Sequence, residues 1–144
     1  MNPQRVTVAK FISILQRNTK RYFDTALETD PIGSGQHFFL LRIYENEGIT
    51  MYDLARQGNF DKGTVTKAVQ KMAELGYIRM ETDTRDRRIR HLYVTEEAMP
   101  FIRKIYRLRN DWQEKLFAGF SQEEAERCYR QLERMAENSC EALQ

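Results

Sequence analysis

The most constraining feature of this sequence is a pair of adjoining amphipathic segments that lead directly into two strand-like segments. The first, about 51–57, ends at a turn that contains Gly58, and the second, 61–75, ends at Gly76. Within the second segment the apolar residues recur at helical spacing, at Val65, Ala68, Val69, Met72 and Leu75. Two short helices joined by a tight glycine-containing turn predict a helix-turn-helix.

Strand-forming residues follow the second helix immediately. Residues 77–82 and 90–94 are rich in β-branched and aromatic types, and the charged stretch 83–89 separates them. This pattern predicts a β-hairpin. A hairpin in this position is the wing of a winged-helix domain, which we expect to span residues 36–95.

Capping residues mark where the helices of this domain begin and end. Thr50 and Asp61 have the side chains that accept hydrogen bonds from the free N–H groups of a first helical turn, so we expect both to be N-caps. Thr95 is expected to cap a long helix after the hairpin. Gly48 is expected to end the preceding helix in the left-handed conformation.

Helical periodicity also covers both ends of the chain. Apolar residues recur every three or four positions over residues 6–27, and Ser121 with Glu124 has the spacing of a capping box for a last helix. The predicted fold is therefore mainly α with a small β wing. Residues 1–35 and 96–144 form the expected flanking helices.

Positive charge is concentrated in the predicted winged helix. The whole chain has 23 Lys and Arg against 21 Asp and Glu. Residues 56–93 hold nine positive and five negative side chains, a net charge of +4, whereas residues 121–144 hold three and six, a net charge of −3. A basic region of this kind is typical of proteins that neutralise the phosphates of duplex DNA.

The face of helix 61–75 opposite its apolar stripe carries short polar and basic groups, which are Lys62, Gly63, Thr64, Thr66, Lys67 and Gln70. In the major groove, glutamine can pair with adenine, lysine with guanine, and threonine with the thymine methyl group. Gly63 would let the backbone approach the DNA closely. A solvated helix face is the alternative interpretation of the same residues.

The predicted hairpin turn carries three arginines, Arg85, Arg87 and Arg88, within four positions. We expect Asp83 and Asp86 to brace the turn through charge-assisted hydrogen bonds to guanidinium groups. A braced turn can present an arginine to the negative minor groove. The alternative is a charged turn that serves only to keep the hairpin solvated.

The sequence resembles the MarR family of bacterial winged-helix regulators over nearly its whole length. The resemblance rests on Leu54-Ala55, Asp61-Lys62-Gly63-Thr64-Val65-Thr66, Leu75-Gly76-Tyr77-Ile78, Asp83-Thr84-Arg85-Asp86-Arg87-Arg88 and Val94-Thr95-Glu96. The Asp-x-x-Asp-Arg-Arg wing is its most specific part. Thr84 stands where the family often has proline, and Ala98 where it often has glycine.

The resemblance implies a DNA-binding transcriptional regulator that reads palindromic operators as a homodimer, with repression as the expected effect. It assigns insertion into the minor groove to Arg87, with Arg88 as the alternative, and bracing of the wing to Asp86 and Arg88. The sequence itself does not distinguish repression from activation, and it specifies neither operator nor effector.

Dimerisation also follows from the amount of apolar surface on the flanking helices. A winged helix of about 60 residues is too small to cover the apolar stripes of 1–35 and 96–144, so a second copy is the simplest cover. Recognition helices about 34 Å apart would then read half-sites about 10 base pairs apart.

Four aromatic residues on segments that should converge near the dimer junction, Tyr22, Phe23, Phe38 and Trp112, are candidates for a pocket that takes a small aromatic effector. Packing in the core explains the same residues without a ligand. An effector that favours another half-site spacing would lower DNA affinity by linkage.

Other classes of function lack support in the sequence. The two histidines, His37 and His91, lie 54 residues apart, and there is no phosphate-binding glycine pattern, so we expect no enzyme, cofactor or metal site. Cys128 and Cys140 are too far apart along one helix for a disulfide. The alternative to a regulator is a winged-helix adaptor that binds protein rather than DNA, for which the recognition face should be acidic or apolar.

No apolar run reaches the roughly 18–20 residues that a membrane span needs, and the first ten residues lack the apolar core of a signal peptide. We therefore expect a cytoplasmic protein with no membrane partner.

Overall fold

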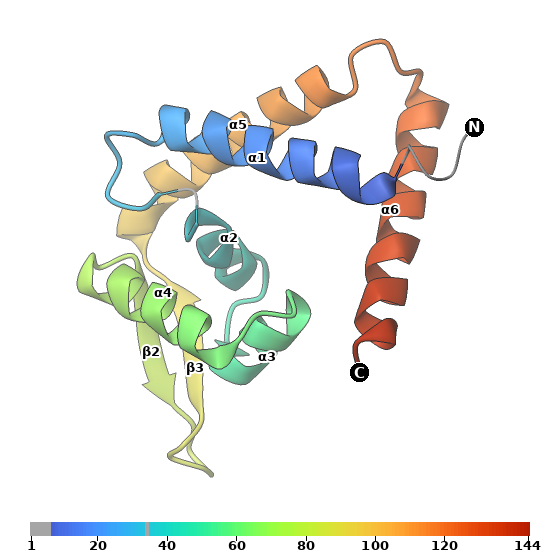
Figure 1. The fold of residues 1–144 in the computed structure, drawn as a ribbon. Helices are drawn as coiled ribbons and strands as arrows, with labels where there is room; N and C mark the ends of the chain where they lie inside the picture. Colours follow the sequence, from blue (N-terminus) through green and yellow to red (C-terminus); the bar gives the residue numbers. More distant parts are fainter. Residues whose placement is uncertain (1–6, 34) are drawn as a thin grey trace. The chain divides into compact units, whose positions relative to one another are not determined.

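Figure 1 shows the chain as a computed structural model, which describes residues 7–33 and 35–144. The residues group into two compact units, Met1–Leu108 and Arg109–Gln144. The elements are α1 (Val8–Ala26), α2 (His37–Glu45), β1 (Ile49–Thr50), α3 (Met51–Gln57), α4 (Lys62–Glu74), β2 (Ile78–Thr82), β3 (Arg90–Val94), the 3₁₀ turn η1 (Glu96–Ala98), α5 (Met99–Leu116) and α6 (Gln122–Ala142). The predicted class, mainly α with a small β wing, is confirmed.

Side-chain caps begin the helices that the sequence predicted. The hydroxyl of Thr50 accepts a hydrogen bond from the Asp53 amide at 3.1 Å, and the carboxylate of Asp61 accepts one from the Thr64 amide at 2.9 Å. Ser121 and Glu124 form the reciprocal pair of a capping box at the start of α6. These bonds satisfy amide groups that have no partner within the helix, which is why the starts of α3, α4 and α6 were predictable.

The sheet has three antiparallel strands in the order β1-β3-β2. Strand β3 pairs with β2 from Ile78 opposite Val94 to Thr82 opposite Arg90, which confirms the predicted hairpin. Strand β1 was not predicted. Its two residues pair with the other edge of β3, with Ile49 opposite Leu92.

The core of the first unit lies between the sheet and its helices. Its most deeply buried side chains are Ile32, Phe39, Leu40, Ile43, Leu54, Val65, Val69, Met72, Leu92, Ile102 and Ile105. The apolar stripe of α4 therefore faces inward, as its helical spacing predicted, and the opposite face is left for contacts outside the unit.

Two predicted caps differ from the structure. Gly48 takes a left-handed φ of 90°, but α2 ends three residues earlier, where the side chain of Asn46 donates to the Arg42 carbonyl at 2.9 Å. Thr95 makes no side-chain cap. Its hydroxyl donates to the Gly76 carbonyl at 2.6 Å, and η1 separates it from α5. In both places a polar group bonds to a residue far along the chain instead, because the Gly48 amide donates to the Leu92 carbonyl and the Thr95 hydroxyl to the Gly76 carbonyl.

Helix α6 in the second unit buries none of its side chains. The ring of Phe117 contacts those of Phe120 and Tyr129, with centroids 5.3 and 5.7 Å apart. Cys128 is half-buried, Cys140 is exposed, and both are free thiols. Across the described part of the chain, none of the helices combines the length and apolar content that crossing a membrane requires.

Candidate nucleic-acid interface

The outer face of α4 is open to solvent. Lys62, Lys67 and Gln70 are exposed, and their side chains have no hydrogen-bond or ion-pair partner among the described residues. Gly63 and Thr64 are also exposed, and Thr66 is half-buried. All six predicted DNA-contacting residues of this helix therefore lie on its outer side, and the two lysines are available to an anion.

The two threonines of α4 already use their hydroxyl protons. Thr64 donates to the second carboxylate oxygen of Asp61 at 2.7 Å, and Thr66 donates to the Lys62 carbonyl at 2.8 Å. The bonds from Thr64 hold the pKa of Asp61 below its usual value. Each threonine can still offer a methyl group or accept a hydrogen bond. It can no longer donate a hydrogen bond to a base unless its present bond breaks.

Gly63 has a local role in the same cap. A Cβ atom at this position would lie 3.3 Å from the Asp61 carboxylate oxygen, which is tighter than ordinary contact. From the sequence, Gly63 is expected to let DNA approach the backbone closely. The geometry adds that the absence of a side chain leaves room for the capping carboxylate.

Asp83 organises the start of the wing turn, residues 83–89. Its Oδ1 accepts hydrogen bonds from the amides of Arg85 and Asp86 at 2.8 and 2.9 Å, and its Oδ2 lies 2.8 Å from Nε2 of His91. Led by the bond to His91, these contacts lower the pKa of Asp83 to about 2. The expected bond from Asp83 to a guanidinium was wrong, because two backbone amides and an imidazole take its oxygens.

Asp86 holds Arg88 on the other side of the turn. The Nε and Nη2 atoms of Arg88 donate to the two oxygens of Asp86 at 3.1 and 3.0 Å, and the Arg88 amide donates to Oδ1 at 3.0 Å. This two-point contact lowers the pKa of Asp86 and raises that of Arg88. The Arg88 guanidinium is thus fixed in direction, although 90% of the side chain is exposed.

Arg85 and Arg87 differ from Arg88 in having no side-chain partner within residues 7–33 and 35–144. Both are exposed on the turn. Figure 1 shows the hairpin turn extending beyond the helices of the first unit, with α4 lying against the hairpin. The turn therefore presents two unpaired guanidinium groups on a loop that Asp83 and Asp86 hold.

The two side-chain contacts of His91 are not predicted by the sequence. Its Nδ1 lies 2.8 Å from the carbonyl oxygen of Gly48, which is 43 residues earlier, in addition to the contact with Asp83. The hydrogen bond to Asp83 is the main cause that raises the pKa of His91, and the Gly48 carbonyl adds to it. No local pattern marks this residue, because both partners come from other elements.

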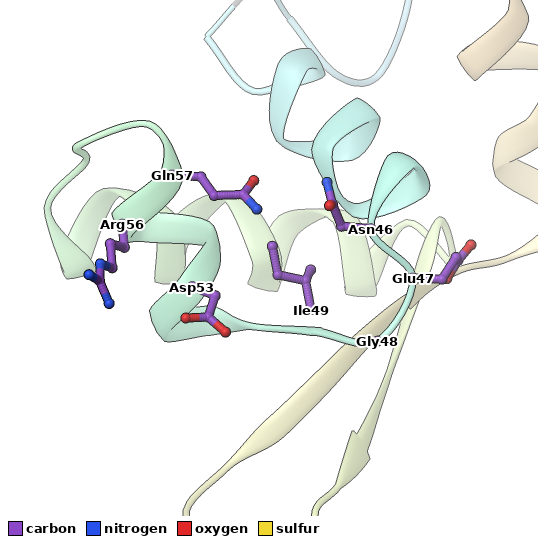
Figure 2. A pocket seen from close by; sticks show the side chains of 7 residues that line it. All are labelled: Asn46, Glu47, Gly48, Ile49, Asp53, Arg56 and Gln57. Atoms are coloured by element: carbon purple, nitrogen blue, oxygen red, sulfur yellow. The ribbon is translucent and has the colours of Figure 1, made fainter. Parts of the chain in front are cut away.

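A wide, open hollow of about 740 Å³ lies beside α3, and Figure 2 shows its lining. The residues come from the loop between α2 and β1, from β1 and from α3, and they are Asn46, Glu47, Gly48, Ile49, Asp53, Arg56 and Gln57. Its charged side chains are the acidic Glu47 and Asp53 and the basic Arg56, so it offers no uniform charge to a ligand.

None of the four aromatic residues predicted to bind an effector lines this hollow. Phe23 is buried and stacks on His37 with centroids 4.5 Å apart, while Tyr22 meets Phe23 edge-on. Phe38 contacts the rings of its neighbours Phe39 and Phe60. Trp112 is half-buried and belongs to the second unit. In the described residues no three His, Cys, Asp or Glu side chains gather as metal ligands would.

Comparisons with known proteins agree on one family. A sequence profile of the MarR family matches residues 32–89. The HTH-type transcriptional regulator YybA of Bacillus subtilis (strain 168) is 32% identical over 104 residues, which are 72% of this chain and 69% of YybA.

Solved structures agree with these sequence matches. The crystal structure of a MarR transcriptional regulator from Methanosarcina mazei Go1 has a TM-score of 0.85 and 32% identity, over 94% of this chain and 97% of that one. A MarR family regulator from Listeria monocytogenes, crystallised with a 26mer DNA, has a TM-score of 0.88 at 21% identity, over 92% and 89% of the two chains. At that identity the likeness concerns the fold.

Proposed function

The chain belongs to the MarR family of transcriptional regulators, and from this premise we propose that it binds palindromic operator DNA as a homodimer. In this proposal α4 enters the major groove and the wing turn enters the adjacent minor groove. The observation that carries it is that Arg85 and Arg87, on a turn braced by Asp83 and Asp86, have no side-chain partner in the described part of the chain.

The shape and charge of α4 support its part in this proposal. A helix with its side chains is about 10–12 Å wide, which matches a major groove about 12 Å wide. Lys62, Lys67 and Gln70 are exposed on the outer face, and this face is neither acidic nor apolar. An adaptor that binds protein would need one of those two characters, so duplex DNA is the partner we propose.

In this proposal the arginines of the wing have two different roles, bracing the turn and contacting DNA. Arg88 is tied to Asp86 and keeps the turn in shape, whereas Arg87 has its guanidinium available for the minor groove. The narrow minor groove has a strongly negative potential that attracts arginine. We therefore assign insertion to Arg87 and keep Arg85 as a contact to the neighbouring phosphates.

Homodimerisation is supported by apolar side chains that the single chain leaves exposed. On α1 these are Val8, Phe11, Ile12, Ile14 and Leu15, and on α6 they are Tyr129, Leu132 and Met135. Apolar stripes of this length on a soluble chain mark an interaction surface. A second copy of the chain would bury them and would pair two winged helices about one turn of DNA apart.

Selection of binding sites from random duplexes tests the proposed function. The expected result is an enriched palindrome with half-sites centred about 10 base pairs apart. Enrichment of one half-site alone would contradict the dimer, and no enrichment at low salt would contradict DNA binding and favour the adaptor. Transcription in vitro from a promoter that carries the palindrome then tests repression, because the proposal expects less transcript when protein is added.

Release of DNA by a small aromatic effector stays a prediction. The ring contacts of Phe23 and Phe38 are compatible with an effector site and equally with packing of the core. Titration of phenolic acids against the protein–operator complex measures it. Release by at least one acid is expected, and retention of DNA with all of them would contradict it.

A further inference from the structure

The side chain of His91 lies between two hydrogen-bond acceptors from different parts of the first unit. Its Nδ1 is 2.8 Å from the Gly48 carbonyl oxygen, and its Nε2 is 2.8 Å from Oδ2 of Asp83. Gly48 directly precedes β1 and α3, whereas Asp83 begins the wing turn. His91 therefore joins the wing turn to the segment that leads into the helix-turn-helix.

The Gly48 end of this connection is held firmly. The Gly48 amide donates to the Leu92 carbonyl at 2.8 Å, so strand β3 fixes both polar groups of this residue. Its φ of 90° favours glycine, and a Cβ atom would lie 3.3 Å from the Tyr93 hydroxyl. Any movement after loss of the His91 contacts is therefore expected in the turn and not at Gly48.

Both partners of His91 only accept hydrogen bonds. A neutral imidazole has one N–H group and one lone pair, so it can donate to only one of them. The carboxyl group of Asp83 does not supply the missing proton, because its pKa is about 2. The doubly protonated imidazolium is the form that donates to Gly48 and Asp83 at the same time.

We propose that the imidazolium form of His91 anchors the wing turn to the start of the helix-turn-helix, so that operator affinity falls as pH rises. This inference rests on the proposed DNA binding, because the wing is the part that would enter the minor groove. His91 acts here as a positioning residue, since its ring is engaged with Asp83 and Gly48.

The groups around His91 favour its charged form. Asp83 faces it from the wing turn, and Glu81 lies opposite it on β2 in an ion pair with Arg79. On β1 the neutral Thr50 lies in register with His91, and the carbonyl of Gly48, just before β1, faces its ring. The pKa of His91 is raised above its ordinary value of 6.5. The anchor is therefore fully formed below pH 6.5 and is lost as the pH rises through the raised pKa.

The ring titration of His91 in the free protein tests the anchor without DNA. The chain has two histidines, so the NMR signals of His91 are assigned by comparison with His91→Gln. We expect His91 to titrate above its ordinary value, and Asp83→Asn to lower this pKa. Asp86→Asn is the matched control, because it removes the same charge from the same turn without touching His91. Equal ring titration in the wild type and Asp83→Asn would overturn the anchor.

The affinity for the selected palindrome, measured from pH about 5.5 to about 9, tests the consequence. We expect a loss on the order of tenfold with rising pH, the effect of one charge-assisted hydrogen bond. Its midpoint should match the ring titration, should move down in Asp83→Asn, and should be absent in His91→Gln. If His91 titrates as expected but the operator affinity stays the same across this pH range, the positioning role is overturned.

Failure to bind any duplex at any pH would contradict the proposed function instead. In that case hydrogen exchange of the Arg85 and Asp86 amides, which Asp83 holds, still decides whether the turn is anchored. Protection factors, which correct for the base-catalysed intrinsic exchange, support the anchor if they fall above the pKa of His91 in the wild type but not in His91→Gln, and equal pH dependence in both proteins contradicts it.

Discussion

The winged helix and α6 use their apolar residues in opposite ways. In the winged helix the apolar stripe of α4 is buried and its exposed face is polar. In α6 no side chain is buried, although its apolar residues recur at the same helical spacing. Helical periodicity therefore identifies the apolar face of a helix, but it does not show what covers that face.

The strongest way to test the self-contained core is Met72→Ala. Met72 is fully buried on α4, so its truncation leaves a cavity, and we expect the free energy of unfolding to fall by about 2–5 kcal/mol. Chemical denaturation measures the change. Lys71→Ala, on the exposed side of the same helix, should change stability by less than about 0.5 kcal/mol. Equal effects of the two changes would contradict the burial pattern.

Leu132→Glu tests whether the exposed stripe of α6 needs a partner. A carboxylate would lose its hydration in an apolar interface, so we expect the dimer dissociation constant to rise by about a hundredfold or more. Sedimentation over a concentration series measures this constant. Gln131→Glu adds the same charge one position away and should have a much smaller effect. Unchanged association in Leu132→Glu would contradict the role of this stripe.

Arg87→Ala tests the polar side of the comparison. We expect weaker operator binding, and a salt slope smaller by about 0.9 in log–log terms for each positive charge that no longer neutralises phosphate in the minor groove, one per subunit. Fluorescence anisotropy at several salt concentrations measures both. Arg103→Ala on α5 removes the same charge outside the wing and should leave the slope unchanged. If Arg87→Ala also leaves the salt slope unchanged, insertion into the minor groove is assigned to Arg85 or Arg88 instead.

The smallest expected effect is that of Ser121→Ala. It removes the hydroxyl that accepts from the Glu124 amide, and loss of such a cap costs about 1 kcal/mol of helix stability. Thermal unfolding followed by circular dichroism measures the change. Ser139→Ala is the control, because the Ser139 hydroxyl only bonds back to the Ala136 carbonyl within α6. A larger loss from Ser139→Ala than from Ser121→Ala would contradict the capping box.

Local signals account for what could be predicted of the fold. Thr50 and Asp61 accept bonds from amides three residues away, so the starts of α3 and α4 could be read from adjacent residues. Gly76 has the left-handed φ of 78° that the end of α4 required. Strand β1 had no such signal, because two residues gain a strand conformation only by pairing with β3.

The candidate site shows the same division. The exposed face of α4 and the charged turn followed from spacing and charge, although their contacts with DNA stay predictions. The partners inside the turn did not follow, because Asp83 had guanidinium groups and an imidazole within reach along the chain. The choice of His91 depended on the hairpin register, which brings Glu81 opposite His91 and the turn close to the ring.

Residues a few positions apart predict the helices, the caps at Thr50, Asp61 and Ser121, the hairpin and the separation of basic and acidic regions. Tertiary structure alone decided that β3 has a second partner in β1, that Thr95 bonds to Gly76, and that His91 connects Gly48 with Asp83. These contacts join residues that are 8 to 43 positions apart, and their geometry exists only after the elements have packed.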